Sequence, residues 1–478
     1  MQSKGIIWLV ASYLAISLIV TYFFPQKSSI FILVLVYFAI CIYIGYSASK
    51  NKSHEGFLMA DRNIGLFQLT GTLVASFIGA STLLVYTAFV YTYGIAAFWM
   101  FIGFFLGFGI FGYFGVFLKK HADKKRYYTL SDYFKDKHGK VLAAIATLAI
   151  FIFYFGALSN QYIGGAKVLS HISGWSYTTA LLVMSAIILI YTLGGGFRSV
   201  VQTDAFQYLL MMILPVILVF SLKSGISLRA EYFNIFNAGW TNTISFLLYG
   251  IFTNFILAEL WQRAYAAKDA KTIKKAFPLA GLCILFLGVL FTYLGLVART
   301  VFPAIDPDLT GVYAFTSLIP GSLLAISLVF MFAAIMSSAD TILFVLAMNV
   351  SQDIISHKKK IDAKKKVLYT KAALVSFTIL AILIALVYPE MVNIIIVYTS
   401  LGASLSPLVI ISWLSKKPSL LAMKLSFAIS SVITLVLVFA FKYISPGLGL
   451  VAVINAWVVY YLVYFFERAS RGRTVKRA

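Results

Sequence analysis

The sequence predicts an all-α membrane protein with about fourteen transmembrane helices, and three observations lead to this prediction. Of the 478 residues, 61% are apolar or aromatic and only 12% are charged, and the mean hydropathy is +0.92. Apolar runs of about 17–25 residues, each long enough to cross a bilayer as a helix, follow one another along the chain. The basic residues gather in a few of the polar connections between these runs. This composition excludes a soluble enzyme and a disordered chain.

The chain carries 39 Lys and Arg against 16 Asp and Glu, a net charge of +23. In a soluble protein this balance would suggest a nucleic acid as partner. In a membrane protein the cytoplasmic loops collect Lys and Arg, so the expected partner is the lipid bilayer and no nucleic acid is needed. The two cysteines, Cys41 and Cys283, both lie in apolar runs and form neither a disulfide framework nor a metal-binding pattern.

We expect one helix for each apolar run. The first run follows only Lys4 and has no small-residue cleavage site, which indicates a retained helix and not a signal peptide. A short amphipathic helix is expected around 128–137, with Thr129 or Ser131 as its N-cap. The expected spans are 6–24, 29–49, 65–92, 94–118, 139–169, 177–193, 202–221, 244–263, 275–302, 319–350, 366–388, 391–412, 418–441 and 446–466.

The distribution of basic residues predicts the orientation. With the N-terminus inside, the basic connections 119–126, 268–275 and 358–366 and the tail 468–477 all fall on the cytoplasmic side. We therefore expect a multi-pass protein of the cell membrane with both termini in the cytoplasm. The basic residues left outside are Lys27, Lys167, Lys223, Arg229, Arg299 and Lys442.

We expect a single transmembrane domain over residues 1–478, because the longest polar connections have only about twenty residues. Two N-terminal helices would occupy 1–64, a ten-helix core 65–412, and two C-terminal helices with a basic tail 413–478. In the core, helices three to seven and eight to twelve form two five-helix sets of similar length. Since five is odd, the second set runs opposite to the first, which predicts a 5+5 inverted repeat.

Three acidic residues fall within the expected spans, namely Asp204, Glu259 and Asp340. An ionisable group at membrane depth is costly and indicates a functional site unless a local contact explains it. Glu259 stands four residues before Arg263, so an ion pair within one helix explains it. Asp204 begins its expected helix, where it could simply cap the helix, so a structural role and a functional role both stay open. For Asp340, deep in its helix, a structural role and a cation-binding role both stay open.

Asp340 belongs to a polar cluster, Ser337-Ser338-Ala339-Asp340-Thr341, whose oxygens suit a hard cation such as Na⁺. Serine also packs ordinary membrane helices, so the cluster needs a partner. Two other spans carry glycine and hydroxyl residues, at 69–82 and at 248–254. Such interruptions in corresponding places of two halves predict two broken helices with a binding site between them, although glycine is also common in intact membrane helices.

Four segments resemble the sodium/solute symporter family, whose members carry sugars, proline, pantothenate, sialic acid and other small solutes. The second and fourth are specific, because a Gly-Gly turn leading to T-D-x-x-Q and an A-x-M-S-S-A-D helix rarely coincide in one chain. The resemblance covers roughly residues 30–412 and implies the leucine-transporter fold. The segments are GFLMADRNIG (56–65) leading into FIGAST (77–82), GGGFRSVVQTDAFQ (194–207), QRAYAAKDAK (262–271) and FAAIMSSADTILFVLAMNVSQDI (332–354).

The resemblance also implies residue roles. The main sodium site would use the backbone carbonyls of Leu69, Thr72 and Ala334 and the hydroxyls of Ser337 and Ser338. A second cation site, found in some members, would use Asp204, Ser337, Asp340 and Thr341. Asp340 replaces a hydroxyl found in those members, so sodium and a proton both stay open as its ligand. The solute pocket would be lined by Gly71, Ser76, Thr253 and Asn254, with Tyr154 or Thr399 beside them.

We therefore expect sodium-coupled symport of a small organic solute by alternating access, with Na⁺ as the coupling ion and no organic cofactor. An amino acid or a carboxylate is favoured as the solute. Proton coupling on the same fold is the alternative, favoured by Asp204 and Asp340. An integral membrane enzyme is disfavoured, because the three acidic residues lie on three helices and no D-x-x-D motif occurs. The sequence leaves open the solute, the ion stoichiometry and the oligomeric state.

Overall fold

The structure of the chain is a computed structural model that describes residues 28–48, 54–194, 196–222, 225–355 and 363–475. Within these ranges every regular element is a helix, which confirms the all-α fold. An isolated bridge joins Ile64 to Ala267. The first expected span, 6–24, and most of the basic connection 358–366 lie outside the described residues.

The helices follow the expected spans closely. Among the described residues, nine helices are long and apolar enough to cross a membrane, or ten when one bent pair counts as a span. The expected total of fourteen is not confirmed, because the apolar parts of three further helices are shorter than a full span. Apart from the two broken spans described below, the helices that correspond to the expected spans are α2 (Ser28–Ala48), α6 (Trp99–Lys125), α8 (Lys140–Ser173), α9 (Tyr177–Gly194), α10 (Phe197–Phe220), α13 (Ala270–Val301), α15 (Leu324–Asn349), α16 (Ala363–Val387), the consecutive pair α17 (Met391–Ala403) and α18 (Ser406–Leu414), α19 (Leu420–Phe439) and α20 (Gly447–Val475).

The connection between α6 and α8 holds the expected short helix, α7 (Leu130–His138). The Thr129 hydroxyl accepts a hydrogen bond from the amide of Asp132, and the Asp132 carboxylate accepts one from the amide of Thr129. This capping box satisfies two backbone donors at once. Thr129, and not Ser131, is therefore the N-cap.

The first broken span begins with α4 (Leu66–Phe77). Ile78 is extended, with φ −85° and ψ 90°, and a π-helical turn, η3 (Ser81–Val85), leads into α5 (Tyr86–Tyr93). The Thr82 hydroxyl donates to the carbonyl of Phe77 at 2.7 Å and so satisfies an acceptor that the end of α4 frees. The break lies inside the FIGAST segment, where the sequence predicts it.

The second broken span consists of α11 (Gly239–Ile256) and α12 (Ala258–Ala266), which meet at Leu257 with a bend of 51°. The expected interruption at 248–254 was wrong, because α11 is helical through these residues. Gly250 instead lets α11 approach α6: a Cβ there would lie 2.4 Å from the carbonyl oxygen of Met100. This glycine serves close helix packing and does not break the helix.

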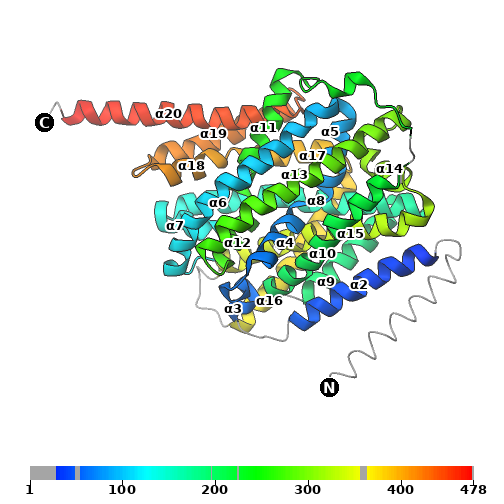
Figure 1. Cartoon of the computed structure of the whole chain (residues 1–478). Helices are drawn as coiled ribbons and strands as arrows, with labels where there is room; N and C mark the ends of the chain where they lie inside the picture. Colours follow the sequence, from blue (N-terminus) through cyan, green and yellow to red (C-terminus); the bar gives the residue numbers. More distant parts are fainter. Residues whose placement is uncertain (1–27, 49–53, 195, 223–224, 356–362, 476–478) are drawn as a thin grey trace.

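Figure 1 shows the helices packed side by side in one bundle, with α2 along one edge and α20 along another. Helix α10 packs against α2, α4 and α15, and α13 packs against α4 and α6. Helix α15 lies deepest, since its side chains are buried continuously from Ser327 to Asn349. The two broken spans therefore lie against a buried helix that carries the polar cluster.

Candidate sodium and solute site

Two adjacent serines join α15 to the first broken span. The Ser337 hydroxyl donates to the carbonyl of Ala75 at 2.7 Å, and it also lies 2.8 Å from the carbonyl oxygen of Ala333. The Ser338 hydroxyl donates to the carbonyl of Ser76 at 2.9 Å. A hydroxyl has one proton to donate, so several carbonyl oxygens around Ser337 leave lone pairs over. This is an oxygen-rich, buried contact between two helices.

The break itself is tightly packed against α8 and α15. The freed amide of Ala80 donates to Oε1 of Gln161 on α8 at 2.7 Å. A Cβ on Gly79 would lie 2.5 Å from the Ser338 hydroxyl and 2.7 Å from Nε2 of Gln161. Glycine is therefore required here for the close approach of the chain to the two side chains. Gln161 was not among the residues expected at the site.

The residues expected to bind sodium are brought together in part. Ala334, Ser337 and Ser338 line the face of α15 that meets α4, and the carbonyl oxygen of Ala334 lies 3.1 Å from the Ser337 hydroxyl. Leu69 and Thr72 lie earlier on α4, where the helix is regular, so their carbonyls belong to helical turns and not to unwound backbone. The carbonyl of Thr72 accepts a bond from the Ser76 hydroxyl at 2.7 Å.

The second expected cation site contains a cation of the protein itself. Arg263 on α12 is fully buried and forms an ion pair with Asp204 on α10, with 3.1 Å between Nη2 and Oδ2. The same nitrogen donates to the hydroxyl of Thr341 at 3.1 Å, and Nε donates to the hydroxyl of Thr72 at 2.9 Å. The Thr72 hydroxyl in turn donates to Asp204 at 2.5 Å. The guanidinium thus links α4, α10, α12 and α15.

This network corrects two local interpretations. Asp204 is not a helix cap, because α10 begins at Phe197 and Asp204 lies two turns inside it. Arg263 does not form its ion pair with Glu259; it reaches only the backbone carbonyl of that residue, at 3.4 Å. The spacing of four residues favoured Glu259 as the partner of Arg263, whereas the fold places the carboxylate of Asp204, on another helix, beside its guanidinium.

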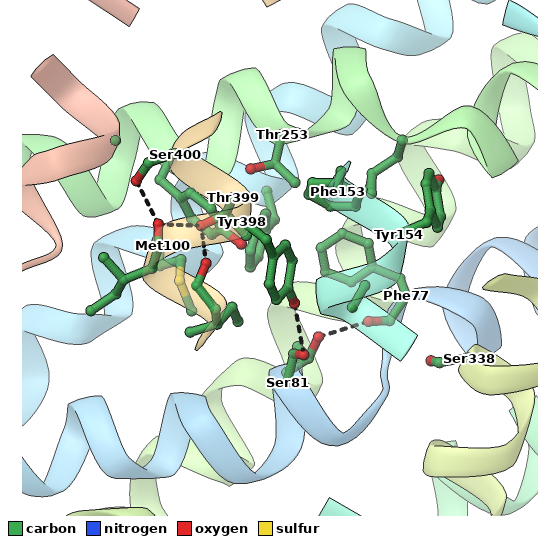
Figure 2. Close-up of a pocket in the computed structure, with 18 of the residues that line it drawn as sticks. Phe77, Ser81, Met100, Phe153, Tyr154, Thr253, Ser338, Tyr398, Thr399 and Ser400 are labelled. Carbon is green, nitrogen blue, oxygen red and sulfur yellow. Dashed lines mark hydrogen bonds between the residues drawn. The ribbon is translucent and has the colours of Figure 1, made fainter. Parts of the chain in front are cut away.

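A cavity lies beside the first break, between α4, α8, α11, α15 and α17 (Figure 2). It encloses about 950 Å³ of atom-free space, counting the part open to solvent. Of the residues expected there, Ser76 and Thr253 line it, as do Tyr154 and Thr399. In Figure 2 the ring of Tyr398 reaches across the cavity toward Ser81, and the two hydroxyls lie 3.2 Å apart. Ser76 and Ser338 belong both to this wall and to the contact between α4 and α15.

Two residues expected in the pocket lie elsewhere. Gly71 packs against α10, where a Cβ would lie 3.2 Å from Cα of Ala205. The side-chain amide of Asn254 donates to the carbonyl of Gly250 at 2.7 Å and faces α6 at Gly107. Both residues therefore serve helix packing.

Glu259 lines the cavity from the first turn of α12. The sequence predicted a structural ion pair for its side chain, and no sequence pattern indicated a position at the cavity. Its backbone amide, freed by the break, donates to the hydroxyl of Tyr154 on α8 at 3.3 Å. Helix α8 thus supplies an acceptor to each break, through Gln161 to the first and through Tyr154 to the second.

A family profile described as the sodium:solute symporter family matches residues 57–419, which is most of the chain. The chain belongs to the sodium:solute symporter family. This membership confirms the resemblance seen in the sequence and identifies the chain as a multi-pass membrane protein for sodium-coupled solute transport. Within the symporter family, the chain is 26% identical over 423 residues to sodium/proline symporter 2 of Staphylococcus saprophyticus, covering 80% of each chain.

Other similar proteins agree with this assignment. The symporter is 31% identical over 188 residues to the sodium/pantothenate symporter of Escherichia coli, covering 38% of each chain. A solved structure of a Na⁺-coupled sialic acid symporter in a substrate-bound, outward-open state aligns with a TM-score of 0.76 at 16% identity, covering 91% of this chain and 97% of that one. A nucleobase-cation-symport family transporter in a closed conformation aligns with a TM-score of 0.55 at 13% identity. These two likenesses show the fold alone.

Proposed function

We propose that this symporter couples the entry of Na⁺ to that of a small organic solute, an amino acid or a carboxylate, by alternating access. The observation that carries the proposal is the position of Ser76 and Ser338. The hydroxyl of Ser338 and the backbone carbonyl of Ser76 form the buried contact between α4 and α15, and both residues also line the cavity. A cation bound at this contact would complete one wall of a solute pocket.

The main sodium site is proposed at the α4–α15 contact, with Ser337, Ser338 and the carbonyl of Ala334 as ligands and further carbonyls from α4. Leu69 and Thr72 are the carbonyls that the family resemblance implies. Hard cations prefer such oxygens, and a cation can replace the hydrogen bonds that now join Ser337 to Ala75 and Ser338 to Ser76. Because the ion and the solute share one wall, each would raise the affinity for the other.

The energy of coupling is sufficient for concentrative uptake. One positive charge that crosses a membrane of 100 mV, inside negative, gains about 2.3 kcal/mol, which supports roughly a fifty-fold solute gradient per ion. The two breaks lie in the first helix of each five-helix set, which supports the 5+5 inverted repeat as the basis of the rocking motion.

We further propose one sodium ion per solute. A second sodium ion at Asp204, Ser337, Asp340 and Thr341 would have to share Asp204 and Thr341 with the guanidinium of Arg263. Arg263 already neutralises Asp204, so the protein itself provides the charge that a second ion would bring. The alternative is that Arg263 moves away during the cycle and a second ion, sodium or a proton, takes its place.

Uptake into proteoliposomes tests these proposals. Purified protein should accumulate labelled amino acids or carboxylates under an inward sodium gradient, and Ser337→Ala and Ser338→Ala should each raise the sodium concentration for half-maximal uptake. Comparing the sodium and solute fluxes should give a ratio of one. Uptake that follows a proton gradient equally well without sodium would contradict the main proposal, and a ratio of two would contradict the single-ion proposal.

The proposed orientation in the cell membrane, with both termini in the cytoplasm, is tested by thiol labelling. The native thiols Cys41 and Cys283 are buried. Glu231 and Asp123 both have exposed side chains, in connections assigned to opposite sides. Glu231→Cys should react with an impermeant reagent in intact cells and Asp123→Cys only after the cells are opened; the reverse pattern would invert the topology.

A further inference from the structure

Glu259 is a buried carboxylate at the wall of the solute cavity. Its exposed fraction is 5%, and among the described residues Oε2 has no hydrogen-bond partner. The residue stands in the first turn of α12, directly after the break at Leu257, so its side chain is fixed by a short, buried helix. A buried carboxylate oxygen without a hydrogen-bond partner is costly unless something else supplies one.

In the ranges that the structure describes, no group supplies a hydrogen-bond partner to Oε2 of Glu259. Arg263, the basic residue one turn further along α12, directs its guanidinium to Asp204, Thr72 and Thr341. It touches Glu259 only through the backbone carbonyl. The dipole of α12 favours a negative charge in its first turn, but this effect is smaller than the cost of removing a carboxylate from water. A structural role alone therefore does not account for Glu259.

The other walls of the cavity match a cation better than an anion. Its lining residues, all within the described part of the chain, include no lysine and no arginine. The walls are rich in aromatic rings, whose faces attract cations. These rings are Phe77, Phe89, Phe104, Phe153, Tyr154, Phe246, Tyr249 and Tyr398. A solute with a positively charged nitrogen would meet one negative charge and several aromatic faces.

We propose that the solute of this symporter carries a protonated amine, and that Glu259 is the counter-ion that selects it. The amine donates an N–H to Oε2 of Glu259. The solute's carboxylate, if it has one, lies toward Ser76 and Ser338, where the coupling ion would balance its charge. This inference rests on the proposed function and narrows it: sugars and carboxylates without an amine leave Glu259 unpaired and are rejected.

The test compares matched solutes in proteoliposomes under a sodium gradient. Each pair shares a carbon skeleton and differs in the nitrogen, such as proline with cyclopentanecarboxylate and β-alanine with propionate. At least one amine should be taken up and its amine-free partner should not. Sodium-driven uptake of the amine-free partners at equal rates would overturn the role of Glu259 while leaving symport intact; the absence of sodium-driven uptake of any solute would instead contradict the proposed function.

The variant Glu259→Gln removes the charge and keeps the shape. It should raise the half-saturating concentration of the amine on the order of 10- to 100-fold, because a charge-assisted hydrogen bond is lost. The half-saturating concentration of Glu259→Asp should lie between those of Glu259→Gln and the native protein. The exposed Glu231→Gln is the matched control and should change nothing.

A second readout separates solute selection from a folding defect. Sodium should still raise the melting temperature of purified Glu259→Gln, since the proposed ion site lies on α4 and α15. If Glu259→Gln keeps native amine affinity, or loses sodium-dependent stabilisation together with uptake, Glu259 is not the counter-ion.

Discussion

The two breaks in this symporter differ in how their charge is balanced. At the first break the groups are neutral: hydroxyls of Ser337 and Ser338, backbone carbonyls, and the amide of Gln161. At the second break the groups are charged, with Glu259 at the cavity and Arg263 one turn further on, paired with Asp204. The first break can therefore accept the sodium ion that we propose there without a charge of its own, whereas at the second break Arg263 already balances the charge of Asp204.

From this difference we expect one part of the site, the α4–α15 contact, to change during transport and another part, the Arg263–Asp204 ion pair, to stay the same. An oxygen-lined contact without a charge can release its ion and reform its hydrogen bonds, so it can alternate between two states. A buried ion pair is strongly held as long as both partners stay together, because separating them leaves a charge without water. We therefore expect the α4–α15 contact to open and close while α12 stays fixed to α10.

The largest expected effect comes from breaking the permanent part. Arg263→Gln leaves Asp204 as an uncompensated buried charge and should lower the free energy of unfolding by about 3–5 kcal/mol. Sodium should stabilise this variant more than the native protein, because the ion can take the place of the guanidinium. Thermal unfolding in detergent, with and without sodium, measures both effects. The double variant Arg263→Gln/Asp204→Asn should recover much of the loss; if it does not, the two charges do not act as a pair.

A somewhat smaller effect is expected at the contact that changes. Gly79→Ala places a methyl group 2.5 Å from the Ser338 hydroxyl and should destabilise the protein by about 1–3 kcal/mol. It should also abolish sodium-dependent uptake, because Ser338 is displaced. Gly109→Ala on α6 is the control, since a Cβ there meets nothing within 4 Å. Sodium-dependent uptake at the native rate in Gly79→Ala would place the ion away from the first break.

Removing the hydrogen-bond acceptor at the first break should lower the free energy of unfolding by about 1–2 kcal/mol. Gln161→Met keeps the length of the side chain but leaves the amide of Ala80 without its 2.7 Å bond. Hydrogen exchange at the Ala80 amide, measured by mass spectrometry of the peptide that contains it, should accelerate. Unchanged exchange would mean that another group already satisfies this amide.

The smallest effect is expected at the second break. Tyr154→Phe removes the hydroxyl that accepts from the amide of Glu259 at 3.3 Å, a longer bond than that of Gln161. We expect a loss of about 0.5–1 kcal/mol, measured by the same thermal unfolding assay. If Tyr154→Phe lowers the free energy of unfolding more than Gln161→Met does, the hydrogen bond at the second break contributes more to stability than the one at the first.

The sequence predicted the parts of this architecture that depend on local composition. Apolar runs located the helices, the FIGAST segment located the first break, and Ser337 and Ser338 marked the helix that meets it. Glycine was less informative: Gly250 looked like an interruption and proved to be a contact between helices. A glycine allows both outcomes, and only the neighbouring helix decides between them.

The ion pair could not be predicted for a different reason. Asp204 and Arg263 are 59 positions apart, and Glu259 is only four positions from Arg263, so a local pattern favoured the wrong partner. In the fold, Arg263 pairs with Asp204 and Glu259 lines the cavity, and neither position is visible in the local sequence pattern. Residues that act through tertiary contacts need the fold before their partners can be named.

The position of α8 in the sequence determines whether the acceptor for each break is synthesised before or after that break. Gln161 lies 81 residues after Ala80, so the first break is synthesised before the helix that satisfies its amide. Tyr154 lies 105 residues before Glu259, so the second break emerges when its acceptor already exists. Lipid offers no hydrogen bond to a free amide. During biogenesis the first break can therefore form only after α8 has been inserted. Until then the segment must either stay an intact helix or be kept from lipid by the insertion machinery. The second break can form as soon as it enters the membrane.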